Sequence, residues 1–204
     1  MIVLLIATRN AHKATEVRQM LPTDCLDLDT FPDAPSIAEV ADTFAGNAAL
    51  KAQGLARWLA KRETAVTHIL ADDSGLEVDA LDGVPGVHSA RFASNNGTNS
   101  PDADNNAKLL QLLEGHPATQ RTARFRCVLA LVETARPDSV QSFEGACEGT
   151  IAESAAGKGG FGYDPLFVPQ GHERTFAELG SEIKNQLSHR AAALARLKAW
   201  LASD

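Results

Sequence analysis

The first residues of the chain decide its fold class. Residues 2–13 read Ile-Val-Leu-Leu-Ile-Ala-Thr-Arg-Asn-Ala-His-Lys. The apolar run over residues 2–7 is typical of a strand that is buried on both faces. Thr8 and Arg9 interrupt the run, and Asn10 is a suitable N-cap for a helix over residues 11–21. The chain therefore begins as strand, tight loop and helix, which favours an α/β fold.

The rest of the sequence alternates predicted strands and helices. Apolar stripes predict helices over 43–61, 100–113 and 188–202. Apolar runs and alternation predict strands over 68–71, 76–80, 121–134, 140–151 and 165–168. In this interpretation Asp72-Asp73-Ser74-Gly75 lies at the end of a strand. No repeat, low-complexity tract or long linker divides the chain. We therefore predict one domain over residues 1–204 with a mixed sheet.

Composition excludes several functional classes. The chain has 204 residues, 44% of them apolar, so it is not expected to be disordered. A net charge of −7 argues against a nucleic-acid polymer as partner. Three cysteines without a CxxC pair argue against a disulfide framework, and the histidines form no zinc motif. No apolar run is long enough to be a signal peptide or to span a membrane. We expect a cytoplasmic enzyme or binding protein without a membrane partner.

Two segments in the first half of the chain are candidates for binding a phosphate group and a metal. Residues 8–13 lie between a strand and a helix N-terminus, where backbone N–H groups attract anions. The alternative is an ordinary strand–helix connection. Asp72 and Asp73 follow a strand, and adjacent residues of an extended backbone point to opposite faces. One carboxylate can then hold Mg²⁺ while the other pairs internally. The alternative is a polar turn.

Two further segments lie in the second half. Residues 157–162 satisfy G-x-G-x-x-G, but Pro165 follows where a dinucleotide-binding helix must begin. We interpret residues 155–163 as a loop whose Phe161 is available to stack on a base, and a surface hairpin is the alternative. Ser188 is a predicted cap for the last helix, which puts His189 and Arg190 in its first turn. Basic residues are unfavourable there, so an anion or a carbonyl oxygen is a plausible ligand.

The order and spacing of these segments resemble the inosine triphosphate pyrophosphatase family over nearly the whole chain. The matching stretches are Ala7–Lys13, Thr43–Ala48, Ala71–Leu76, Gly86–Arg91, Gly159–Pro165 and Ser188–Arg190. The chain departs from residues that are common in that family at four positions, which are Arg9, Ala38, Val40 and Gly46.

The resemblance implies a two-lobed α/β fold with a long central mixed sheet, flanking helices and a nucleotide cleft between the lobes. It also implies a homodimer. The implied reaction is Mg²⁺-dependent hydrolysis of ITP, dITP or XTP to the monophosphate and pyrophosphate, which clears deaminated purines from the nucleotide pool.

The resemblance also implies a role for individual residues. Asp73 matches the proton acceptor and a Mg²⁺ ligand, and Glu39 matches a second metal-binding carboxylate. The substrate-binding positions are Thr8, Arg9, Asn10, Ala11, His12, Lys13, Asn47, Lys51, Ser74, Phe161, Gly162, Tyr163, Asp164, Lys184, His189 and Arg190. Two alternatives remain open. One is a pyrophosphatase for pyrimidine nucleotides, against which the Ser188–Arg190 ending argues. The other is a nucleotide-binding module without catalysis, against which the carboxylates and Lys13 argue.

Overall fold

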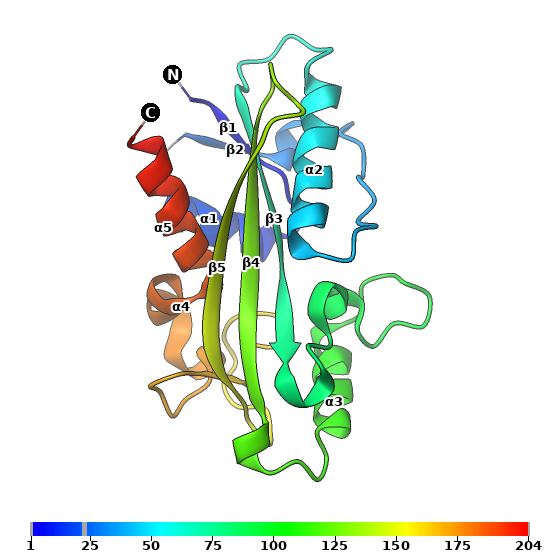
Figure 1. Cartoon of the computed structure of the whole chain (residues 1–204), viewed down its shortest axis with the longest axis vertical. Coiled ribbons are helices and arrows are strands. Elements are labelled where there is room, and N and C mark those ends of the chain that lie inside the picture. Colours follow the sequence, from blue (N-terminus) through cyan, green and yellow to red (C-terminus); the bar gives the residue numbers. More distant parts are fainter. Residues whose placement is uncertain (1, 22–23, 204) are drawn as a thin grey trace. The chain divides into compact units, whose positions relative to one another are not determined.

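The computed structural model describes residues 2–21 and 24–203, and it has an α/β architecture (Figure 1). The helices are α1 (Ala11–Met20), α2 (Phe44–Leu59), α3 (Asp102–Leu112), α4 (Phe176–Leu187) and α5 (His189–Leu201). The strands are β1 (Leu4–Ile6), β2 (Cys25–Asp27), β3 (His68–Val78), β4 (Thr122–Glu133), β5 (Val140–Ile151) and β6 (Phe167–Pro169).

The six strands form one sheet in the order β2-β1-β3-β4-β5-β6. Strand β1 is parallel to both β2 and β3, whereas β5 and β6 are antiparallel. The sheet is therefore mixed, and the predicted α/β class with a central mixed sheet and flanking helices is confirmed.

The chain folds into two compact units. The first unit contains the residues up to Asp73, Cys127–Glu144 and the residues from Ala193 onward. The second unit contains Ser74–Arg126 and Gly145–Ala192. The chain passes from one unit to the other inside β3, β4, β5 and α5. The peptide bond between Asp73 and Ser74 is one of these crossing points.

Each unit has its own hydrophobic core. In the first unit, α1 and α5 pack on one face of the strands, and Figure 1 shows α2 on the opposite side. In the second unit, residues of α3, α4 and the strands surround a cluster of aromatic rings. The rings of Phe125 and Phe167 lie 4.7 Å apart there, and those of Phe167 and Phe176 lie 5.4 Å apart. These cores fix the elements that carry the polar side chains described below.

Local sequence signals explain the helix boundaries. Asn10 caps α1 by accepting from the Lys13 N–H at 3.1 Å, as predicted. Thr43 caps α2 in the same way through the Gly46 N–H. The sequence predicted Ser100 as the cap of α3 and Pro101 as its first residue. The helix begins one residue later, at Asp102, and Pro101 occupies the cap position with an extended ψ of 141°. Within the described residues, no helix is long and apolar enough to cross a membrane.

The structure corrects the interpretation of Asp72–Gly75. These residues do not end a strand but lie inside β3, which runs without a break from His68 to Val78. Turn-forming residues continue the strand here because their side chains find partners. Asp72 and Asp73 bond to lysines and Ser74 bonds to an arginine, so the buried polar groups are compensated.

Candidate active site

The loop between β1 and α1 is built largely from its own hydrogen bonds. The Asn10 N–H donates to Thr8 Oγ1 at 3.1 Å, and the Asn10 side chain caps the helix. Arg9 Nη2 donates to the Ala34 carbonyl at 2.6 Å, so this guanidinium holds a neighbouring loop of the same unit. The first turn of α1 contains no acidic residue, and Ala11 and His12 are exposed there. The helix N-terminus is therefore available to a negatively charged group.

Asp72 and Asp73 contact different partners, as expected for neighbours on a strand. Asp72 Oδ1 accepts from Lys13 Nζ at 2.7 Å, and Cys127 Sγ lies 3.2 Å from Asp72 Oδ2. Asp73 Oδ1 accepts from Lys51 Nζ at 3.2 Å. Both carboxylates are buried. Both carboxylates thus pair with a lysine, Asp72 with Lys13 and Asp73 with Lys51, and the assignment of one of them to Mg²⁺ stays a prediction.

Asp73 and Glu39 share one ammonium group. Lys51 Nζ lies 3.2 Å from Asp73 Oδ1 and 3.4 Å from Glu39 Oε2. Burial raises the pKa of the Asp73 carboxyl above its ordinary value, while the positive charges of Lys51 and Lys13 act in the opposite direction. Asp73 Oδ2 is buried and has no hydrogen-bond partner among the residues that the structure describes. A buried oxygen without a donor is a good ligand for a hard cation.

The donor set fits magnesium better than zinc. In the part of the chain that the structure describes, no group of three or more His, Cys, Asp or Glu side chains is close enough to hold a metal ion. Mg²⁺ does not need such a cage, because it binds through one or two carboxylates and completes its shell with water and phosphate oxygens. Asp73 and Glu39 supply that number of carboxylates.

Asn47 lies in the interior and orders the loop that carries Glu39. Its side chain is fully buried, and Asn47 Oδ1 accepts from the Ala41 N–H at 2.9 Å. The preceding residue, Gly46, lies so close to this loop that a Cβ there would be 2.6 Å from Ala41 Cβ. Asn47 therefore contacts the loop that carries Glu39, and the substrate contact that the resemblance implies stays a prediction.

The second unit contains a tight cluster around the glycine-rich loop. Asp164 accepts from the Phe161 N–H at 2.8 Å and from Lys184 Nζ at 2.5 Å. Lys184 Nζ also lies 4.3 Å from the centre of the Phe161 ring. Both charged side chains are buried, so the ion pair is strongly protected from water. The cluster holds Phe161 against a cationic group at the edge of the loop.

Three residues that sequence reasoning missed anchor the same loop. The Gly162 N–H donates to Asp102 Oδ2 at 2.6 Å, and Asn106 Nδ2 donates to the Gly162 carbonyl at 3.0 Å. Tyr163 Oη donates to the Ser89 carbonyl at 2.9 Å. Burial raises the pKa of the Tyr163 phenol, with a smaller contribution from Asp102. Asp102 and Asn106 are four residues apart on α3, and that helical spacing was the available signal.

The segment at the start of α5 is buried. Ser188 caps the helix through the Ala191 N–H at 3.2 Å, as predicted. Arg190 has an exposed fraction of 0%, and its Nη2 donates to Ser74 Oγ at 2.9 Å. The His189 ring stacks on Phe125 with centroids 4.8 Å apart. The second unit thus brings Ser74 and Arg190 together, and separately brings together Phe161, Asp164 and Lys184.

Comparison with known proteins shows the family of this chain. The Ham1 family profile matches residues 4–200. The chain belongs to the Ham1 family. It is 50% identical over 197 residues to a dITP/XTP pyrophosphatase of Geobacillus kaustophilus, covering 95% of this chain and 91% of that protein.

Solved Ham1 structures have the same fold. A HAM1 protein from Coxiella burnetii has a TM-score of 0.86 and 37% identity, with both chains covered completely. The Staphylococcus aureus Ham1 protein has a TM-score of 0.83 and 35% identity, with 98% of both chains covered. The resemblance inferred from the sequence is therefore confirmed at the level of family and fold.

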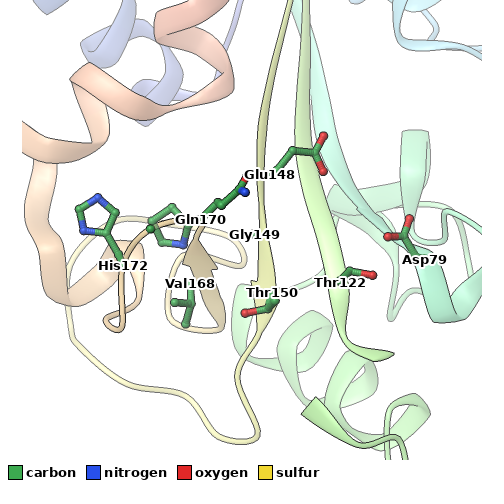
Figure 2. Close-up of a pocket in the computed structure, with 10 residues that line it drawn as sticks. Asp79, Thr122, Glu148, Gly149, Thr150, Val168, Gln170 and His172 are labelled. Atoms are coloured by element: carbon green, nitrogen blue, oxygen red, sulfur yellow. The ribbon is translucent and has the colours of Figure 1, made fainter. Parts of the chain in front are cut away.

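A separate cavity of this Ham1-family chain lies in the second unit (Figure 2). It has a volume of about 540 Å³ and is lined by residues of β4, β5 and β6, by Asp79 after β3 and by the residues after β6. Figure 2 shows Glu148, Thr122 and Asp79 along one side and Gln170 and His172 along the other. None of the predicted site residues lines this cavity, so we do not assign the substrate to it.

Proposed function

We propose that this protein hydrolyses ITP, dITP and XTP to the nucleoside monophosphate and pyrophosphate, with Mg²⁺ as cofactor. One observation carries this proposal. Asp73, whose buried Oδ2 finds no donor within residues 2–21 and 24–203, shares Lys51 with a second carboxylate, Glu39. This arrangement suits a carboxylate that holds a cation and accepts a proton. The activity printed in the name of the Geobacillus kaustophilus relative is of the same kind.

The first unit supplies the groups for the triphosphate. Lys13 and the first turn of α1 offer N–H donors to phosphate oxygens. When bound, Mg²⁺ neutralises phosphate charge and polarises the phosphorus. Asp73 and Glu39 are the residues that would hold it. Asp73 accepts a proton from the attacking water.

The glycine-rich loop and helices α4 and α5 carry groups that suit a purine base. Phe161 offers a ring face for stacking, and Lys184 and Arg190 offer hydrogen-bond donors only. A 6-oxo purine accepts hydrogen bonds at its 6-position, whereas the 6-amino group of adenine donates. An amino group facing donors would leave buried polar groups unpaired, and such sites discriminate strongly.

The proposal extends to assembly and location. We propose that residues 1–204 act as one two-lobed pyrophosphatase domain, and that the protein is a homodimer in the cytoplasm. The family resemblance supports the dimer. Cys25, Cys127 and Cys147 are all free thiols, which suits a reducing compartment. Light scattering after size-exclusion chromatography tests the dimer, since a mass near 21.7 kDa would contradict it.

The activity is tested by a panel of ITP, XTP, GTP, ATP and dUTP with and without Mg²⁺, with pyrophosphate as the measured product. We expect turnover of ITP and XTP that requires Mg²⁺. Preferred turnover of dUTP would favour the pyrimidine alternative.

The Asp73→Asn variant separates the enzyme from a binding module without catalysis. It is expected to bind ITP but to lose turnover, because an amide cannot accept the proton. Full activity in this variant would contradict the role of Asp73.

A further inference from the structure

Two lysines of the first unit donate to the same residue, Asp72, but at different atoms. Lys13 Nζ donates to the side-chain oxygen Oδ1 at 2.7 Å. Lys51 Nζ donates to the main-chain carbonyl of Asp72, also at 2.7 Å. The Asp72 side chain is only 4% exposed. A change of the Asp72 side chain therefore acts on Lys13 and leaves the acceptor of Lys51 in place.

The two ammonium groups differ in how many of their protons are used. An ammonium group has three N–H donors. Lys51 faces three acceptors, which are the Asp72 carbonyl, Asp73 Oδ1 at 3.2 Å and Glu39 Oε2 at 3.4 Å. Within residues 2–21 and 24–203, Lys13 Nζ has one acceptor, Asp72 Oδ1. Lys13 therefore keeps donors for a ligand, whereas Lys51 is already engaged by the Asp72 carbonyl, by Asp73 and by the ion pair with Glu39.

The Asp72 carboxylate is itself held in one orientation. Its second oxygen, Oδ2, lies 3.2 Å from Cys127 Sγ, and the residue is part of the central strand β3. A lysine side chain has many rotamers, and an oriented partner restricts them. Lys13 also remains partly accessible, with 17% of its side chain exposed. One hydrogen bond to Asp72 therefore restrains the Lys13 ammonium group, and part of the side chain remains accessible to a ligand.

We propose that Asp72 is a positioning residue that holds Lys13 in the conformation that binds the substrate phosphates. This inference rests on the proposed function of the same site. Asp72 does not touch the reacting atoms, and it acts through Lys13. Lys51, by contrast, positions Asp73 and Glu39, so the two lysines have different tasks.

The Asp72→Asn variant tests this role. It removes the charge that holds Lys13 but keeps the carbonyl that accepts from Lys51. Because charge-assisted hydrogen bonds are the strong ones, we expect kcat/KM for ITP to fall about 10- to 100-fold. Cys127→Ser is the matched control, since it changes a side chain that contacts the carboxylate at Oδ2 and keeps the charge. It is expected to retain kcat/KM within about twofold of the unmodified protein.

A double-mutant cycle separates positioning from general stabilisation. In a Lys13→Met background, Asp72→Asn is expected to have almost no further effect on kcat/KM. In a Lys51→Met background, its full effect is expected to persist. Equal losses in both backgrounds would overturn the proposal and make Asp72 a structural residue. Melting temperatures of all variants show whether a smaller fraction of folded protein accounts for a lower kcat/KM.

Binding of inorganic tripolyphosphate by calorimetry provides a readout that needs no turnover. Asp72→Asn is expected to weaken tripolyphosphate binding. This effect should vanish in the Lys13→Met background and persist in the Lys51→Met background. If the unmodified protein releases no pyrophosphate from ITP, the proposed function fails while this binding cycle still decides the role of Asp72. Unchanged tripolyphosphate affinity in Asp72→Asn would overturn the positioning role.

Discussion

Breaking the buried ion pair of the second unit has a large predicted cost. Lys184→Met leaves the Asp164 carboxylate, whose side chain is 2% exposed, without the ammonium that lies 2.5 Å away. Removing one partner of a buried pair costs about 3–5 kcal/mol. The lost cation–π contact with Phe161, about 1 kcal/mol, is offset by a sulfur–aromatic contact of similar size. We therefore expect a loss of about 3–5 kcal/mol in the free energy of unfolding.

Urea unfolding followed by circular dichroism measures this loss. With a slope of about 2 kcal/mol per M urea, the midpoint is expected to fall by about 2 M. The matched control is the double variant Asp164→Asn with Lys184→Met. Its amide oxygen still accepts from the Phe161 N–H and carries no charge, so most of the stability is expected to return. A single variant within about 1 kcal/mol of the unmodified protein would refute the reasoning. A double variant no more stable than the single one would also refute it.

Three further predictions concern other parts of the chain. Gly46→Ala places a methyl group against Ala41 and is expected to cost about 1–3 kcal/mol, which Ala41→Gly should largely restore in thermal melts. Asp102→Ala removes the acceptor of the Gly162 N–H and is expected to raise KM for ITP roughly fivefold, whereas an unchanged KM would show that the loop needs no such anchor. Burial raises the pKa of the Cys147 thiol to about 11, so roughly one molecule in a thousand is thiolate at pH 8. Iodoacetamide should then modify Cys147 in urea but not in the native protein, and rapid native labelling would contradict its burial.

Much of the fold followed from periodicity and caps. Strand β5 has the predicted bounds, and the caps Asn10 and Ser188 are as expected. Helix α4 was missed even though Thr175 and Glu178 form a capping box at its start. Strand β2 has only three half-buried residues, so it shows too short a pattern to predict.

The site was predictable in its residue types but not in its contacts. The adjacent carboxylates predicted opposite faces, and the contacts of Asp72 and Asp73 agree with that. The continuous strand through them was not predicted, because the partners that compensate their charge come from distant parts of the sequence. The interior position of Asn47 and the hydrogen bond between Arg190 and Ser74 were not predicted either, because tertiary hydrogen bonds leave no local pattern in the sequence.

We expect this chain to split 6-oxo purine triphosphates at the bond that releases pyrophosphate. Phosphorus NMR of ITP and ATP, each incubated with the protein and Mg²⁺, tests it most directly. ITP is expected to yield IMP and pyrophosphate, while ATP stays intact over the same time. Formation of IDP with inorganic phosphate, or equal consumption of ATP, would contradict it.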